Sequence, residues 1–496
     1  MLTRLKVTGF KNLVDVDVRF GPFTCIAGAN GVGKSNLFDA IRFLSALADL
    51  PLVEAALSVR DGGTSAADVQ SIFHKVGSEY DKEMSLVAEM IVPFEGVDDW
   101  GQATQASATY LQYSVSLACR KNADVQPDSL EITKEELVPI NPDKAELNAL
   151  FAHTPAWGKT AISGSGTKPV ISTTEKSGQR VITLHSSIGP ISPAAVNLPH
   201  TVLSKSGAAA SATASLARRE LQSWRLLQLE PASLRKPDEF GTAANLDSNG
   251  AHIAATLYRL ANPSVTKRNG HRTSKAASSQ VYSGIANRLY ELLGEVREVE
   301  IDRDVKRELL TLLVKGKDGT TLPARALSDG TLRFLALAIL EADPQAQGLF
   351  CLEEPENGIH PERIPAMIQL LRDIATDPML PLGDDNPLRQ VIINTHSPAI
   401  VAQVPDDSLL IAQTEETSRG KKRFNRAVFN CLPGTWRDDG QTSAVNRGAL
   451  LAYLNPVIRQ PFSNGTHERR VPERRVIDRE DLSAFIPGAA PKTKSR

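Results

Sequence analysis

The chain has 496 residues and a net charge of -1, with 41% hydrophobic and 23% charged residues. These values are typical of a soluble globular protein with more than one lobe, and they exclude a largely disordered chain and a globally cationic nucleic-acid binder. The four cysteines form no CxxC pair, which indicates free thiols in a reducing compartment. No apolar run reaches the roughly 18 residues of a membrane span, and the start alternates like a strand rather than a signal peptide. We therefore expect a cytoplasmic protein.

The N-terminal part predicts strands around a glycine-rich turn. Residues 2–8 and 13–20 alternate like a hairpin, and the apolar run Phe23–Ala27 predicts a buried strand. A turn and a helix follow at 28–48. Three further strand-like stretches predict an antiparallel sheet beside this core, at Ser85–Val92, Tyr110–Ala118 and Leu130–Val138.

The middle of the chain predicts insertions and helices. Residues 157–185 and 205–215 are rich in Gly, Ser, Thr, Ala and Lys, which favours loops. Helical periodicity then predicts a small helical lobe, with helices at Leu216–Leu227, His252–Ala261 and Gln280–Leu293. No heptad pattern is sustained here, which argues against the long coiled-coil arm of chromosome-maintenance ATPases.

The C-terminal part predicts a hairpin through residues 317–319, then a helix, two apolar strands and their connecting helix between 327 and 404. Beyond Pro461 the chain mixes basic residues with Pro, Gly and acidic residues, so disorder is expected and nucleic-acid contact is the second interpretation. The basic residues are Arg469, Arg470, Arg474, Arg475, Lys492, Lys494 and Arg496. The predicted divisions are 1–200 and 296–460 for the two parts of one head, 201–295 for the helical lobe and 461–496 for the tail.

Residues 28–35 match the phosphate-binding pattern GxxxxGK[ST], and they lie between an apolar strand and a helix, as that loop requires. Glycines let backbone N–H groups turn toward phosphates, a lysine adds a cation and a serine supplies a Mg²⁺ ligand. A chance glycine-rich turn would rarely have both neighbours in register. ATP and Mg²⁺ are therefore the predicted ligands, and the predicted nucleotide-binding residues are Gly28, Asn30, Gly31, Gly33, Lys34, Ser35 and Asn36.

Residues 348–355 form an apolar strand that ends in two carboxylates. Neighbouring residues of a strand point to opposite sides, so we expect Glu353 to face a metal ion and Glu354 to face the attacking water as general base. A strand ending in Glu-Glu-Pro alone would usually be a solvated strand end. The presence of a phosphate-binding loop in the same chain favours the metal-binding and catalytic interpretation of these carboxylates.

Two helix starts carry further candidates. His396 precedes Ser397 and Pro398, which are expected to begin a helix, so the histidine lies at a strand-to-helix corner where it could reach a γ-phosphate or the water. A lone loop histidine is more often structural; His360 is the weaker candidate, and no Cys or His spacing supports zinc. Ser328 precedes an apolar helix and is a natural N-cap with a free helix dipole, which in isolation would be a plain cap.

Together these motifs resemble the RecF/OLD-like branch of ABC-type AAA ATPases, relatives of the SMC heads. Residues 9–12 resemble the opening "GF[KR]N" turn of that family, and residues 353–361 resemble its "EEPExxLHP" segment. The resemblance covers 1–48 and 320–400. It implies an α/β P-loop NTPase head of the ABC type, with an antiparallel β-subdomain and a small helical insertion lobe.

The resemblance also implies roles. It assigns catalysis to Glu354 and His396, Mg²⁺ binding to Ser35 and Glu353, and an approach to the phosphates to Lys11. Ser328 and Gly330 belong to the signature motif, which contacts the γ-phosphate held by the opposite subunit of an ATP-dependent homodimer.

Two features depart from the family pattern. The signature reads LSDGT instead of LSGGQ, and no glutamine has a clear Q-loop context; Gln70 is a candidate, and 60–62 is a second segment for that region. OLD nucleases continue into a Toprim domain, whereas this chain ends without one, so a nuclease is expected on another polypeptide.

Two functions fit these observations. One is the ATPase component of an anti-phage or stress system that controls a separately encoded nuclease, Toprim-like protein or toxin. The other is a RecF-like repair ATPase that clamps duplex DNA. A transporter subunit is disfavoured, because a long stretch separates the phosphate-binding loop from the signature and LSGGQ is missing.

Overall fold

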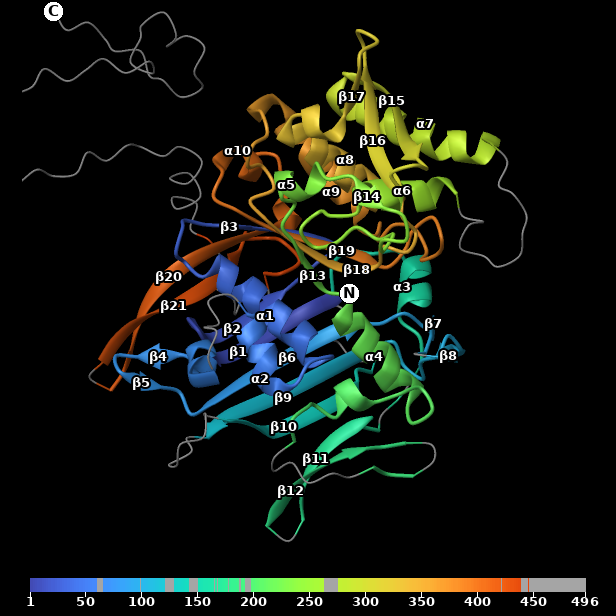
Figure 1. The fold of residues 1–496 in the computed structure, drawn as a ribbon. Coiled ribbons are helices and arrows are strands. Elements are labelled where there is room, and N and C mark those ends of the chain that lie inside the picture. The colour runs from blue at the N-terminus through green and yellow to red at the C-terminus, as the bar shows by residue number, and fades with distance from the viewer. Residues whose placement is uncertain are drawn as a thin grey trace, which may run out of the picture. The chain divides into compact units, whose positions relative to one another are not determined.

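A six-stranded sheet contains strands from both the N-terminal and the C-terminal parts of the described chain (Figure 1). In the computed structural model its order is β13-β18-β19-β3-β20-β21, and every pair is parallel except β20 with β21. The central strands β3, β18 and β19 contain apolar runs because both faces of a parallel sheet are covered. The strands are β3 (Phe23–Ala27), β13 (Arg225–Leu227), β18 (Gly348–Glu353), β19 (Arg389–Thr395), β20 (Leu409–Arg419) and β21 (Lys422–Cys431).

The structure describes residues 1–59, 66–98, 100–120, 129–141, 150–164, 166, 168–176, 178–186, 189–191, 198–262, 275–420, 422–438 and 445. The elements below belong to the unit Met1–Leu454. The predicted tail after Pro461 lies outside the described residues. No helix of the described part is long and apolar enough to cross a membrane.

A seven-stranded sheet lies beside the first and is antiparallel throughout, in the order β12-β11-β10-β9-β6-β1-β2. It confirms the predicted hairpin at the start of the chain and the predicted antiparallel sheet. Its strands are β1 (Leu2–Phe10), β2 (Leu13–Arg19), β6 (Glu83–Ile91), β9 (Tyr110–Arg120), β10 (Ser129–Pro139), β11 (Ile171–Lys176) and β12 (Gln179–Leu184).

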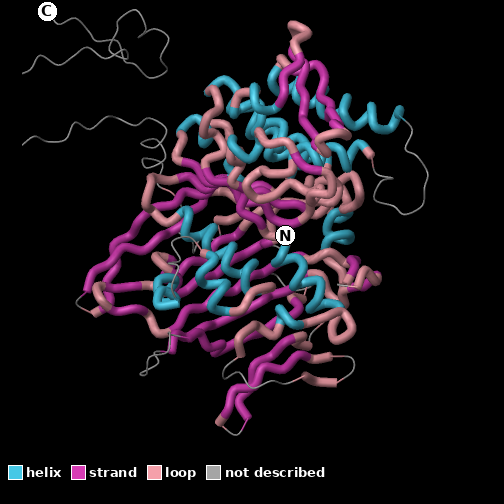
Figure 2. The backbone as a smooth tube through the Cα atoms, viewed as in Figure 1, coloured by secondary structure: helices cyan, strands magenta, loops and turns pink. Residues whose placement is uncertain are grey.

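Helices lie on both sides of the six-stranded sheet (Figure 2). On the side of the seven-stranded sheet they are α1 (Lys34–Leu47), α2 (Leu52–Ser58) and α4 (Ala212–Gln222). On the other side they are α6 (Ile253–Ala261), α7 (Lys275–Leu293), α8 (Asp329–Ala342) and α9 (Ile364–Ile374). The shorter helices are α3 (Pro155–Ala161), α5 (Pro231–Leu234) and α10 (Pro398–Val401), with 3₁₀ turns η1 (Ala66–Ile72), η3 (Leu203–Lys205), η5 (Ala324–Ala326), η6 (Pro361–Arg363) and η7 (Asp406–Ser408).

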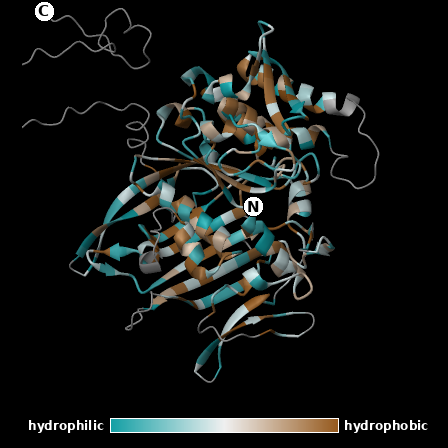
Figure 3. Cartoon of the chain, viewed as in Figure 1, coloured by the Kyte–Doolittle hydropathy of each residue, from teal (hydrophilic) through white to brown (hydrophobic). Residues whose placement is uncertain are grey.

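Strand β18 shows how the sheet separates two hydrophobic cores. Leu349 and Cys351 pack in the core that contains α1, whereas Phe350 and Leu352 pack in the core that contains α8. Successive side chains of a strand point to opposite faces, so one apolar run serves both layers. Figure 3 shows the same pattern, with hydrophobic residues concentrated along the sheet and the helix faces that cover it.

Smaller sheets complete the unit. The predicted hairpin through residues 317–319 is confirmed, since it joins β16 to β17. This third sheet contains β14 (Asp238–Glu239), β15 (Val296–Asp304), β16 (Leu309–Gly316) and β17 (Thr321–Pro323). Two short hairpins pair β4 (Lys75–Val76) with β5 (Glu79–Tyr80), and β7 (Glu95–Val97) with β8 (Ala103–Gln105).

Two expectations from the sequence are wrong. Residues 157–185 are not all loop: Trp157 is fully buried in α3, and the β-branched residues of 171–184 form the hairpin β11–β12. Residues 216–227 are not one helix, because α4 ends at Gln222 and the next strand, β13, pairs with β18. The division of the chain at residues 200, 295 and 460 stays a prediction.

Candidate functional site

The glycine-rich turn between β3 and α1 wraps around the side chain of Lys34. The Lys34 Nζ donates to the carbonyl oxygens of Gly28, at 2.7 Å, and Ala29, at 2.8 Å. Gly33 caps α1 with φ of 110°, and a Cβ there would lie 2.8 Å from the Cβ of Ala427, so this position requires glycine. A curved loop that opens a helix is a ready anion site. The local geometry therefore fits a phosphate group.

The two carboxylates end at the same edge of the sheet as this loop. Glu353 pairs in register with Asn394 on β19, and Asn394 pairs with Ile26 on β3. The carboxyl ends of parallel strands meet at one edge, where α/β proteins bind their ligands. The Asn394 amide holds both acids: its Nδ2 donates to Glu353 Oε1 at 3.2 Å, and its Oδ1 accepts from the Glu354 backbone N at 3.2 Å.

Glu354 leaves the strand in a left-handed conformation, with φ of 45°. Such backbone strain in a residue other than glycine recurs at functional sites. Its Oε1 lies 2.7 Å from His396 Nδ1, and its Oε2 accepts from Asn357 Nδ2 at 2.8 Å. Burial by itself raises the pKa of Glu354, but the bonds from Asn357 and His396, together with the charge of His396 and of Lys34, lower it overall. The carboxylate is therefore ionised at neutral pH.

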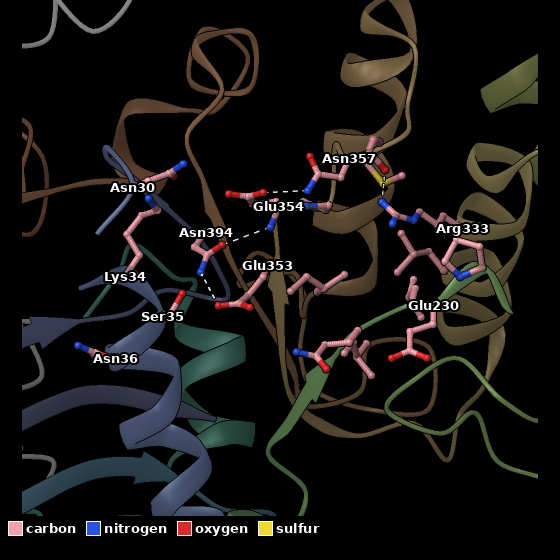
Figure 4. A pocket seen from close by; sticks show the side chains of 18 of the residues that line it. Asn30, Lys34, Ser35, Asn36, Glu230, Arg333, Glu353, Glu354, Asn357 and Asn394 are labelled. Carbon is pink, nitrogen blue, oxygen red and sulfur yellow. Dashed lines mark hydrogen bonds between the residues drawn. The ribbon is translucent and has the colours of Figure 1, made fainter. Parts of the chain in front are cut away.

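The two carboxylates, Asn357 and Asn394 line one cavity of about 620 Å³ between the phosphate-binding loop and α8 (Figure 4). His396 and Gly28 are not among the residues that line it. In Figure 4 Lys34, Ser35 and Glu353 lie on one side and Arg333 and Glu230 on the other. Burial lowers the pKa of the Lys34 ammonium, while three nearby carboxylates oppose that effect. The predicted residues brought together here are Asn30, Gly31, Gly33, Lys34, Ser35, Asn36, Glu353 and Glu354. One hydroxyl, two carboxylates and a lysine suit a Mg²⁺-bound polyphosphate.

Lys11 and Asn12, in the turn between β1 and β2, are not among the residues that line the cavity. The Lys11 Nζ forms an ion pair with Asp39 on α1, at 2.9 Å. Asn12 accepts a bond from Asn36 Nδ2 at 2.8 Å and donates to the Val32 carbonyl at 3.3 Å. The turn therefore braces the phosphate-binding loop and α1. Contact between Lys11 and a phosphate stays a prediction.

Ser328 lies outside the cavity at the start of α8. Its hydroxyl accepts from the Thr331 backbone N at 3.2 Å, which confirms the predicted N-cap, and the residue is exposed. Gly330 follows in the first turn. Ser397 is also at an N-cap position, but its side chain makes no capping bond, which corrects the expectation for that residue. His360 is exposed, and the described residues contain no metal-binding group of three or more His, Cys, Asp or Glu side chains.

The cavity also contains residues that the motifs did not reveal. Gln228 directly follows β13 and lines the cavity. Gln228 was not predicted, because the sequence pattern assigned residues 216–227 to a helix, whereas residues 225–227 form the short strand β13 that precedes it. Gln70 instead lies in η1, outside the residues that line the cavity, and 60–62 lies outside the described residues. Arg333 on α8 donates to the Asn357 carbonyl.

A family model matches two long segments of the chain. The model described as "AAA domain, putative AbiEii toxin, Type IV TA system" matches residues 23–85 and 202–402, which is more than half of the chain. The chain belongs to this AAA family. The matched segments contain the phosphate-binding loop, the signature loop, both carboxylates and His396. Family membership confirms the predicted AAA class, and the mostly parallel sheet with helices on both sides agrees with the predicted α/β fold.

Individual proteins show more limited similarity to this AAA chain. The DNA replication and repair protein RecF of Porphyromonas gingivalis, from two strains, is 44% identical over 46 residues. That match spans 9% of this chain and 13% of RecF, so the chain covers far less than two thirds of the RecF length. The SmcHead bound to the C-winged helix domain of ScpA is 14% identical, with 87% of this chain and 98% of that chain covered and a TM-score of 0.43. The SMC head domain from Thermotoga maritima is 11% identical with the same coverage and a TM-score of 0.35.

Proposed function

We propose that this AAA head binds ATP with Mg²⁺, dimerises around two nucleotides and hydrolyses them. The observation that carries the proposal is the convergence of Lys34, Ser35, Glu353 and Glu354 on one cavity, while Ser328 begins a helix outside that cavity. One head thus presents two different surfaces suited to phosphate. Both surfaces would contact nucleotide in a dimer in which the cavity of each head faces the partner's Ser328.

Within one head, the backbone N–H groups of residues 28–35 and the Lys34 ammonium would bind the β and γ phosphates. Ser35 and Glu353 would hold Mg²⁺. When bound, the metal ion supplies charge neutralisation for the phosphate oxygens. Gln228 lines the same wall and is suited to hydrogen-bond the water or the metal shell.

Glu354 would act as general base. It takes one proton from the attacking water, whose oxygen bonds to the γ-phosphorus as the bond from that phosphorus to the β–γ bridging oxygen breaks. The bonds from Asn357 and His396 hold the Glu354 carboxylate ionised and oriented. The products are ADP and phosphate.

Ser328 and Gly330 would contact the γ-phosphate held by the partner. The free N–H groups and positive dipole end of α8 suit an anion, and the exposure of Ser328 allows an approach from outside. Hydrolysis then requires both heads.

Mixing two inactive variants tests the shared site. Lys34→Ala removes the cation of one site, and Ser328→Arg places bulk and charge on the opposite surface. In their heterodimer one site has both an intact Lys34 and an intact Ser328, so part of the ATPase activity should return. Each variant alone is the control. If no activity returns although heterodimers are verified, or if Ser328→Arg hydrolyses ATP normally as a monomer, the shared site is wrong.

Two biological roles are compatible with the proposed ATPase activity. The family description names a toxin of a type IV toxin–antitoxin system, which supports a role in defence or stress. Control of a separately encoded effector is the further step of this proposal. The short similarity to RecF supports the alternative, a clamp on duplex DNA. Duplex DNA binding that requires ATP, without any effect of a neighbouring gene product on cell growth, would favour the clamp. A neighbouring nuclease or toxin whose activity depends on Glu354 would favour the effector system.

A further inference from the structure

The signature loop has an aspartate where transporter-type signatures have glycine, and that aspartate has a partner. Arg235 forms an ion pair with Asp329 and donates from the same nitrogen to the Leu327 carbonyl, at 3.1 Å. Leu327 and Asp329 flank Ser328 on either side. One guanidinium therefore contacts the signature loop before and after the serine proposed to contact the partner's phosphate.

Arg235 comes from a segment that begins in the wall of the head's own cavity. Leu227 at the end of β13 pairs with Leu352, and residues 228–231 line the cavity. The chain then turns through α5, and Arg235 caps its end. Leu234 is fully buried in the core that contains α8. Because the segment is short, the position of the Arg235 guanidinium depends closely on the position of the cavity wall.

Backbone bonds keep the segment in place. The Gln228 backbone N donates to the Ser248 carbonyl at 2.7 Å, and the Glu230 backbone N donates to the Asn249 carbonyl at 3.0 Å. The segment is thus anchored at its start by strand pairing and these bonds, and at its end by burial of Leu234. Because its backbone is anchored in this way, Arg235 can orient the loop that its guanidinium contacts.

The pair adds little to fold stability. The side chain of Arg235 is 30% exposed and that of Asp329 is 45% exposed, and ion pairs at such positions contribute little because water and salt screen them. Asp329 is already favoured in the first turn of α8 by the helix dipole. The pair's main consequence is therefore the orientation of residues 327–329.

We infer that Arg235 is a positioning residue that orients the signature loop toward the partner's nucleotide and joins it rigidly to the wall of its own cavity. This inference rests on the proposed ATP-dependent dimer. Asp329, which stands where LSGGQ has its first glycine, is the acceptor for Arg235. Each head would then move its cavity wall and its signature loop together, so that a rearrangement of the wall around bound ATP shifts the surface presented to the partner.

Arg235→Ala tests the inference in a Glu354→Gln parent, in which the ATP-bound dimer should persist. Three quantities are measured: MgATP affinity of dilute monomers, MgATP-dependent dimerisation by sedimentation, and thermal unfolding. Dimerisation should weaken about 5- to 150-fold, the usual range for coupling between sites, while monomer affinity and unfolding stay unchanged. Lys236→Ala removes the neighbouring exposed cation and is the matched control. Arg235→Lys should restore dimerisation only in part, because an ammonium lacks the planar fork.

Asp329→Asn provides the second variant and completes a double-mutant cycle. Arg235→Ala with Asp329→Asn should dimerise about as weakly as the worse single variant, because both remove one interaction. If Arg235→Ala does not fold, Asp329→Asn alone should show the dimerisation defect with normal unfolding. Additive defects, or Arg235→Ala behaving like Lys236→Ala, would overturn the inference and leave the proposed function standing. If the Glu354→Gln parent does not dimerise with MgATP, or Ser328→Arg dimerises normally, the proposed function fails and the inference fails with it.

Discussion

The two large sheets hold polar groups for different purposes. In the six-stranded sheet the polar side chains Glu353, Glu354 and Asn394 gather where parallel strands end, beside an open cavity. In the seven-stranded sheet the carboxylate of Glu135 is fully buried in the middle of β10. Parallel strands bring their carboxyl ends to one edge, whereas antiparallel neighbours alternate their ends, so only the first sheet collects such groups.

Glu135 and Glu354 show what their surroundings do to one chemical group. Glu135 accepts from the backbone N of Val202 and of Leu203, each at 2.8 Å, and burial raises its pKa to about 7. Glu354 is partly open, and the bonds from Asn357 and His396 together with nearby positive charge lower its pKa overall, although burial opposes this. The first carboxyl group fastens a chain segment to a sheet. The second stays ionised and accessible, as a base requires.

The largest expected effect is the loss of ATP binding when a lysine beside the six-stranded sheet is replaced, but not when a lysine of the seven-stranded sheet is replaced. Lys34→Ala should abolish MgATP binding, because it removes the cation at the phosphates while the fold remains. Lys6→Ala, on the exposed face of β1, is the matched control and should bind normally. Calorimetric titration measures both. Tight MgATP binding by Lys34→Ala would mean that the loop at 28–35 is not the nucleotide site.

Glu354→Gln should slow hydrolysis by about 10²- to 10⁴-fold, the usual contribution of a general base, because the amide keeps the shape but cannot take the proton. ATP affinity should change little, and the dimer should accumulate. Single-turnover hydrolysis with labelled ATP and sedimentation measure these effects. Normal turnover by the variant would assign the base to another group.

Glu135 should make the protein less stable as pH rises. Its pKa is about 7 in the folded chain and 4.5 in its ordinary state, so the native state holds the proton more tightly. That contribution is complete below pH 4.5, falls as pH approaches 7 and amounts to at most about 3 kcal/mol. Unfolding by urea from pH 5 to 8 should show this slope, and Glu135→Gln should lack it. Equal slopes in both proteins would contradict the assignment.

The smallest effect concerns an exposed ion pair that links β20 to the chain after β5. Arg419 pairs with Asp81, and the arginine side chain is 54% exposed. Arg419→Ala should cost less than about 1 kcal/mol of unfolding free energy and leave ATP binding unchanged, because water screens the pair. Urea unfolding at low and high salt measures it. A loss of several kcal/mol would show that this pair, rather than the backbone pairing, holds the β20–β21 hairpin.

The sequence alone determined the parts of the site that are local in the chain. A strand, a glycine-rich turn and a helix follow one another within 23–47, so the geometry around Lys34 is set by neighbours and was predictable. The same holds for the Ser328 cap, whose bond reaches only to Thr331. Glu353 and Glu354 were predictable as a strand end, since the apolar run before them is continuous.

Contacts between segments distant in the chain depend on how the chain folds and could not be predicted from local patterns. Pairing with β18 made β13 a strand against its helical pattern, which brought Gln228 to the cavity and Arg235 to the signature loop. Asn394 reaches both acids only because β19 lies beside β18. Lys11 forms an ion pair with Asp39 because α1 packs against the turn between β1 and β2. These outcomes depend on register and packing among distant residues, which local propensity and periodicity do not encode.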